Sequence, residues 1–123
     1  MTDVSPAGNS PPSSETLLKS FKAVVGRSIA PITLRQFAML VLLEQTKGPL
    51  GVDDIALELD LYKHAITRTC DRMSSMGYIS RTVNPADNRM RLIEIKPKGR
   101  DLLMAFHAGV AQPMGKKALS RAA

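Results

Sequence analysis

The sequence is poor in the side chains that small proteins use for covalent or metal-based stabilisation. It contains one cysteine and two histidines among 123 residues. A single cysteine excludes an internal disulfide, and these three side chains fall short of the usual four-ligand structural zinc site. We therefore expect a reduced domain without a metal site, which fits the cytoplasm.

Targeting, membrane and catalytic signals are missing as well. The N-terminus shows no basic region followed by an apolar stretch, and no window approaches the roughly 20 apolar residues that a membrane span requires. No glycine-rich phosphate loop occurs, and neither histidine has an evident acid and nucleophile beside it. These absences favour a soluble protein that is not an enzyme and binds no cofactor.

Positive charge is in excess. The 17 lysines and arginines outnumber the 11 acidic residues, which gives a net charge of +6. Such a balance favours polyanionic partners, nucleic acid first and an acidic membrane surface second. The length suits one domain, because domains most often run to roughly 100–150 residues.

Composition divides the chain into three segments. Serine, proline and glycine fill eight of the first 14 positions, so residues 1–14 offer little apolar surface and are expected to be disordered. Residues 15–112 carry the apolar patterns of a folded domain. Residues 113–123 form a short basic tail.

Two helices are expected first. Ser14 can cap a helix that ends near Gly26, and Thr33 can cap a second helix over residues 34–47. The second pattern is apolar around nearly its whole circumference, which predicts a buried central helix.

A helix-turn-helix is expected next. Residues 51–77 hold two short helical patterns separated by about three residues around positions 60–62, which is the spacing of that motif. Ile66, Cys70 and Met73 recur on one side of the second helix, so we expect that side to be buried. Gly77 is expected to end the helix as a left-handed cap.

The apolar period then changes from helical to alternating. Residues 78–96 predict a β-hairpin, with Arg89 and Arg91 bracketing the point where the chain doubles back. Pro97 fits the first position of a last helix. The expected fold class is mainly α with a small β-hairpin wing.

This order of elements resembles a winged helix, and more narrowly the MarR family of bacterial transcriptional regulators. The resemblance rests on "LRQFAMLVLLEQ", "GPLGVDDIALELDL", "ITRTCDRMSSMGYISR" and "NPADNRMRLIEIKPKGRDLL". It covers roughly residues 33–103, most of the segment expected to fold.

The resemblance implies a homodimer on a pseudo-palindromic operator, with a recognition helix in the major groove and a wing in the flanking minor groove. It also implies repression and control by a small-molecule effector of unknown identity. The recognition helix would span about residues 63–76. Its DNA-facing residues would include Lys63, His64, Thr67 and Arg68, and the wing arginine would be Arg89.

The charge pattern agrees with duplex DNA as the partner. Residues 62–98 hold eight basic and three acidic residues, which leaves +5 of the chain's +6. Arg68 has the geometry to bind guanine, and Thr67 to bind a phosphate or a thymine methyl group. Since at least half of protein–DNA hydrogen bonds go to phosphate and sugar, a positioning role stays open for each. His64 fits a solvated or phosphate-side position better than a base contact.

The wing arginines admit two interpretations each. Arg89 can reach a narrow, negative minor groove with Asp87 holding its guanidinium, or it can merely solubilise the tip. Arg91 can contact phosphate or cover apolar surface with its stem.

Three consecutive residues of the expected recognition helix, at positions 70–72, suggest structural roles. Asp71 and Arg72 are expected to join a salt-bridge network that braces the recognition helix against the wing. The helical phase of Cys70 predicts a buried, unreactive thiol rather than a redox sensor.

The first and last helices carry apolar residues that a single small domain need not bury, and we expect them to form the dimer surface. The set is Leu17, Leu18, Phe21, Val24, Val25, Leu102, Leu103, Phe106 and Val110. Two rival functions remain: a winged helix that binds an acidic protein, and a nucleoid-associated DNA binder without effector control.

Overall fold

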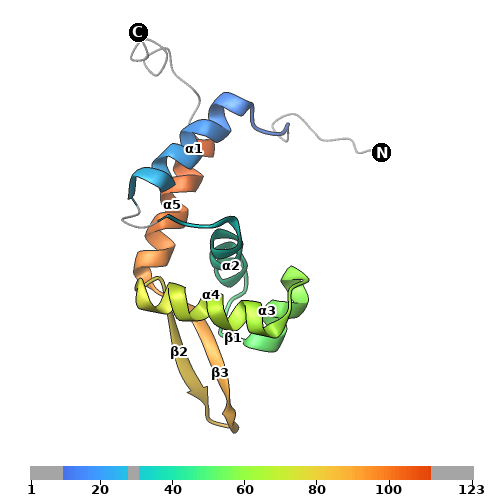
Figure 1. The fold of residues 1–123 in the computed structure, drawn as a ribbon. Coiled ribbons are helices and arrows are strands. Elements are labelled where there is room, and N and C mark those ends of the chain that lie inside the picture. Colours follow the sequence, from blue (N-terminus) through green and yellow to red (C-terminus); the bar gives the residue numbers. More distant parts are fainter. Residues whose placement is uncertain (1–9, 28–30, 112–123) are drawn as a thin grey trace.

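The computed structural model describes residues 10–27 and 31–111, so the expected tail at 113–123 and most of the one at 1–14 lie outside it. The elements are α1 (Ser14–Arg27), α2 (Leu34–Gln45), β1 (Leu50–Gly51), α3 (Val52–Leu59), α4 (Lys63–Ser75), β2 (Ile79–Asn84), β3 (Asp87–Ile95) and α5 (Pro97–Ala111). Figure 1 shows α1 and α5 at one end of the molecule and the β2–β3 ribbon projecting from the other.

Helix α2 is the central helix, as expected. A reciprocal cap starts it, since Thr33 Oγ1 accepts from the Gln36 amide at 3.1 Å and Gln36 Oε1 accepts from the Thr33 amide at 3.0 Å. Met39 is fully buried. The expectation of burial on every side is wrong, however, because Leu34 is 80% exposed and Val41 is also exposed.

Every element contributes to one core, and the two-residue β1 does so through the partly buried Leu50. The helical part of the core follows the expected phases, so the prediction for Ile66, Cys70 and Met73 is confirmed. The fully buried side chains include Met39, Leu40, Ile55, Ile66, Cys70, Met73, Ile79, Ile93 and Leu103.

The turn of the helix-turn-helix depends on one left-handed residue. Asp60 has φ of 56°, and its amide and that of Leu61 bond back to carbonyls of α3. Aspartate tolerates this conformation better than most residues. Gly77 has φ of 83° after α4, which confirms the predicted glycine cap.

The sheet has one strand more than the sequence predicts. Its order is β1-β3-β2 with antiparallel pairs, and β1 pairs Leu50 with Ile93. The chain reverses at Pro85 and Ala86, between paired Asn84 and Asp87. The expectation that the two arginines bracket the reversal is therefore wrong, because Arg89 and Arg91 both lie on β3.

Helix α1 packs along α5 at a close approach. A Cβ on Gly109 would lie 2.6 Å from Ser20 Oγ, so only glycine allows this spacing. The Phe21 and Phe106 rings meet edge to face at 5.1 Å. The helix begins one residue earlier than expected, because Ser13 rather than Ser14 accepts from the Thr16 amide, at 3.2 Å.

The expected dimer surface divides into two groups. Val24, Leu102 and Leu103 are buried in the chain's own core and are unavailable to a partner, so their assignment is wrong. Leu17, Phe106 and Val110 are half-buried. The exposed members, Leu18, Phe21 and Val25, form a stripe along α1.

None of the helices within residues 10–27 and 31–111 is both long and apolar enough to cross a bilayer.

Candidate nucleic-acid interface

Helix α4 presents a polar side opposite its core side. Lys63, Thr67 and Arg68 are exposed, whereas Ile66 and Met73 are fully buried. The helix starts without a side-chain cap on Tyr62, which leaves its first amides open at the end that a recognition helix directs at DNA. The predicted orientation of α4 is thus confirmed.

The first turn of α4 carries two contacts that the sequence did not predict. Lys63 Nζ lies 3.0 Å from Asp53 Oδ1 of α3, and both side chains are mostly exposed. The exposed Tyr62 ring stacks on His64 with centroids 5.6 Å apart. Lys63 therefore has an internal acidic partner, and His64 is held against an aromatic ring.

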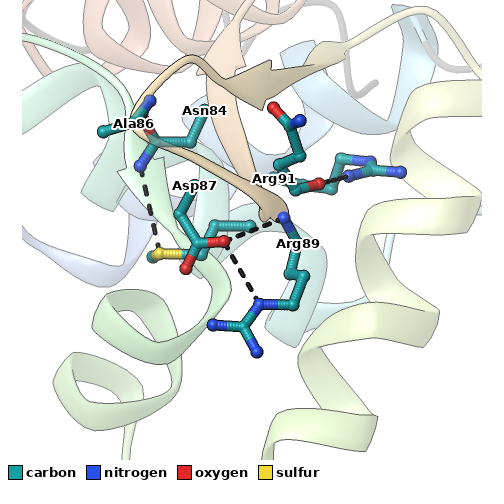
Figure 2. Close-up of polar contacts among 7 residues, drawn as sticks. Asn84, Ala86, Asp87, Arg89 and Arg91 are labelled. Carbon is teal, nitrogen blue, oxygen red and sulfur yellow. Dashed lines mark hydrogen bonds and ion pairs between the residues drawn. The ribbon is translucent and has the colours of Figure 1, made fainter.

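The wing tip is ordered by its own short side chains. Asn84 Oδ1 accepts from the Ala86 amide at 2.9 Å, which is an Asx turn with Pro85 in the position that favours proline. Asp87 Oδ1 accepts from the Arg89 amide at 3.0 Å and from its Nε at 3.3 Å. Figure 2 shows both contacts to Asp87.

Arg89 is positioned yet open to a partner. Its side chain is 90% exposed, and Figure 2 shows the outer guanidinium nitrogens directed away from Asp87. The expected contact with Asp87 is present. Arg91 also stays at the tip, where its Nη1 donates to the Asn88 carbonyl at 3.1 Å.

A recess of about 300 Å³ lies between α4 and the wing. Its basic lining comes from Lys63 of α4, Arg81 of β2, and Arg89 and Arg91 of β3, and Asp53 is the only acid among its lining residues. The fold therefore gathers four of the chain's basic side chains around one concave surface. We call this surface the wing-side recess.

The expected brace between α4 and the wing exists with a different partner. Arg81 Nη1 donates to Asp71 Oδ1, which ties β2 to α4. Among the described residues, Arg72 forms no ion pair, with Asp71 or otherwise. The bracing assignment thus fits Asp71, and the basic partner is Arg81.

Lys98, one of the eight basic residues of segment 62–98, forms contacts within the fold. Lys98 Nζ donates to the Met76 carbonyl at 2.8 Å and lies 4.9 Å from the centroid of the Tyr78 ring. A cation at a helix C-terminus is favourable. Lys98 thereby links the start of α5 to the end of α4.

Cys70 lines the inner wall of the wing-side recess and is only 1% exposed. Burial raises the pKa of its thiol from 9.0 to about 11, with Arg81 lowering it and Asp71 raising it. We expect the native thiol to resist alkylation at pH 8 and to react after denaturation. The folded state keeps the proton longer than the unfolded state does. Its contribution to stability is therefore complete below pH 9 and is lost as pH rises towards 11.

The measurement compares the free energy of unfolding of wild type and Cys70→Ala between pH 8 and 11. Over that window the free energy of unfolding should fall further for the wild type than for Cys70→Ala, because only the wild type has a thiol at this position to ionise. Lysine titration affects both proteins equally. Equal slopes, or rapid native alkylation at pH 8, would contradict the burial argument.

A second prediction concerns Asp53. Asp53→Asn removes an acid from the wing-side recess and frees Lys63, so affinity for duplex DNA should rise by about two- to five-fold at low salt, the scale of an exposed ion pair. Glu58→Gln, on the same helix but not paired with Lys63, is the matched control. Fluorescence anisotropy titrations check both variants. Equal affinities of Asp53→Asn and wild type would show that the pair does not compete with DNA.

Sequence comparisons agree with this geometry. Residues 32–90 match the model of the MarR family, which spans α2, the helix-turn-helix and the wing as far as Met90. The regulator BilQ of Clostridioides difficile, described as an HTH-type transcriptional regulator, is 27% identical over 89 residues, or 71% of this chain. The chain spans 60% of that relative's length.

Solved structures share the fold. A mutant of Escherichia coli MarR in complex with operator DNA matches 80% of this chain and 67% of its own, with a TM-score of 0.65 and 23% identity. The Staphylococcus aureus MepR–DNA complex matches 77% of this chain and 73% of its own, with a TM-score of 0.64 and 22% identity. The fold is the winged helix, and the segment at residues 32–90 is similar to the MarR family domain.

Proposed function

We propose that this chain is a DNA-binding transcriptional regulator that acts as a homodimer in the cytoplasm and represses by occupying a pseudo-palindromic operator. The observation that carries the proposal is the wing-side recess, which joins the exposed side of α4 to an ordered wing arginine. A recognition helix and a wing can enter adjacent grooves only if they share one basic surface of this kind.

Each part of the surface has a distinct task in this proposal. Thr67 and Arg68 face base edges or the phosphates beside them, and Lys63 and Arg91 contact phosphates. His64, held against Tyr62, lies beside the backbone. Arg89 enters the minor groove, where the narrow spacing of A·T tracts strengthens the negative potential.

Dimerisation is proposed through the exposed stripe of Leu18, Phe21 and Val25, with Met104 of α5, which is 60% exposed. An apolar stripe of this length on a small protein favours burial against a second copy. Two-fold symmetry would then place the recognition helices about 34–36 Å apart, one turn of DNA. Control by a small-molecule effector stays a prediction from the resemblance.

Selection of bound duplexes from random sequence tests the proposal. A two-fold repeat with half-sites about one turn apart is expected, together with affinity that falls steeply as salt rises. Binding without sequence preference would favour the nucleoid-associated alternative. Weak binding that is indifferent to salt would favour an acidic protein partner. A monomer in sedimentation at micromolar concentration, with or without the selected duplex, would overturn the dimer.

A further inference from the structure

A second recess lies on the other flank of α4. It measures about 520 Å³ and lies between the first turn of α2 and the residues Arg68, Thr69 and Arg72 of α4. Arg35 of α2 completes its lining on the opposite side. Three arginines from two helices therefore border one shallow hollow, which we call the α2-side recess.

The two recesses lie on opposite sides of α4. With 3.6 residues per turn, Thr67 and Arg72 are separated by about 140° around the helix axis, and Lys63 and Arg72 by about 180°. Thr67 and Lys63 line the wing-side recess, and Arg72 lines the α2-side recess. The exposed face of α4, with His64 and Arg68, lies between these two flanks.

The arginines of the α2-side recess lack acidic partners. No carboxylate lines the recess, and within residues 10–27 and 31–111 neither Arg35 nor Arg68 nor Arg72 forms an ion pair. Elsewhere Arg81 and Arg100 are each paired with a carboxylate. Positive charge is therefore left uncompensated on this flank.

This arrangement costs stability in the free protein. Arg68 and Arg72 are one helical turn apart, at the spacing where like charges repel each other. Arg35 lies in the first turn of α2, the positive end of a helix, and that turn contains no acidic residue. A bound anion would reduce both the repulsion between Arg68 and Arg72 and the unfavourable interaction of Arg35 with the positive end of α2.

The major groove supplies anions in the matching place. A helix that lies in this groove has one phosphate backbone on each side, and the two backbones border a groove about 12 Å wide. The wing-side recess faces one of these backbones if α4 is the recognition helix. The opposite flank, with Arg35 and Arg72, then faces the other.

We propose that Arg35, Arg68 and Arg72 form a phosphate-binding site for the DNA backbone that borders the major groove on the side away from the wing. The inference rests on the proposed function, because it requires α4 to lie in the groove. It adds α2 to the DNA-binding surface through Arg35, and it assigns Arg72 to phosphate. The helix is thus held from both sides, which fixes its depth and register.

The first experiment measures the dissociation constant of the full chain for the selected duplex at several salt concentrations. Arg35→Ala and Arg72→Ala should each weaken binding by about three- to ten-fold and reduce the salt slope by about one. Arg35→Lys should keep the slope, because it keeps the charge. The matched control is Lys47→Ala, which removes an exposed lysine beyond the opposite end of α2 and should leave both quantities unchanged.

The second experiment identifies the phosphate. Duplexes that carry one neutral methylphosphonate each are titrated with wild type and with Arg35→Ala. At one backbone position per half-site, the neutral linkage should weaken wild type but have no further effect on Arg35→Ala. An acidic protein or a free anion as the true ligand would give no such position.

The outcomes separate the inference from the function on which it rests. If wild type fails to bind duplex DNA in a salt-dependent way, both fall. If wild type binds and Arg89→Ala weakens it, but Arg35→Ala and Arg72→Ala equal wild type in affinity and slope, only the α2-side site is overturned. The same holds if Arg35→Ala weakens binding equally on every methylphosphonate duplex. Circular dichroism checks folding, and these exposed side chains should leave the spectrum unchanged.

Discussion

Arg89→Ala is expected to weaken binding of the selected duplex by about 1–3 kcal/mol, roughly five-fold to 150-fold. The side chain is 90% exposed and held from one side only, by Asp87, so its loss should not disturb the fold. One fewer cation on DNA should also reduce the salt slope by about one. Anisotropy titrations at several salt concentrations measure both effects.

Two further variants separate charge from position at the wing tip. Arg89→Lys keeps the charge but loses the planar guanidinium, so it should recover the salt slope and only part of the affinity. Asp87→Asn weakens the hold on the Arg89 side chain and should cost less than Arg89→Ala, because the neutral amide also repels DNA less. Unchanged affinity of Arg89→Ala would mean that the tip arginine only solubilises the wing.

Gly99→Ala is expected to destabilise the protein by about 1–3 kcal/mol, the usual cost of overpacking a filled site. A Cβ at this position would lie 2.5 Å from the Tyr78 carbonyl oxygen and 3.0 Å from Ile95 Cγ1. That carbonyl accepts from the Lys96 amide at 2.9 Å, so the first turn of α5 can move away only by disturbing the base of the hairpin. Thermal and urea denaturation followed by circular dichroism measure the loss.

Gly26→Ala is the matched control for that substitution. It adds the same methyl group to another helical glycine, but among the described residues no atom outside the helix's own backbone and the neighbouring residues lies within 4 Å of the new Cβ. Alanine is the better helix former, so stability should stay constant or rise by about 0.5–1 kcal/mol. Equal effects of the two substitutions would rule out crowding at Gly99 as the cause.

The sequence predicted the elements whose signals are local and strong. The cap at Thr33, the left-handed glycine at Gly77 and the proline that opens α5 each follow from backbone stereochemistry. The buried phase of Ile66 and Met73 follows from helical periodicity. These features need no knowledge of distant residues.

Features that depend on contacts across the fold were missed. Strand β1 is only two residues long and shows no alternation, so its pairing with β3 has no local signal. The exposure of Leu34 and the burial of Leu102 depend on which other elements cover them in the folded chain. Periodicity identifies an apolar side but not what covers it.

The candidate interface was predicted in its charges and missed in its pairings. Lys63, Arg68 and Arg89 were correctly placed on the exposed side, because the helical phase and the turn residues determine it. The contacts of Lys63 with Asp53 and of Arg81 with Asp71 connect different elements. Arg35 has no local sequence signal, because the apolar pattern of α2 indicates only the side that is buried in the core.

The short pairing of Leu50 and Gly51 with β3 couples the movement of the wing to that of the helix-turn-helix. Helix α3 begins at the next residue, Val52, so no linker residue separates the strand paired with the wing from the start of the helix-turn-helix. We therefore expect the β2–β3 ribbon to move together with the start of α3 and not independently of it. In hydrogen exchange, the amides at this junction should open together with those of the middle of β3, at a single rate.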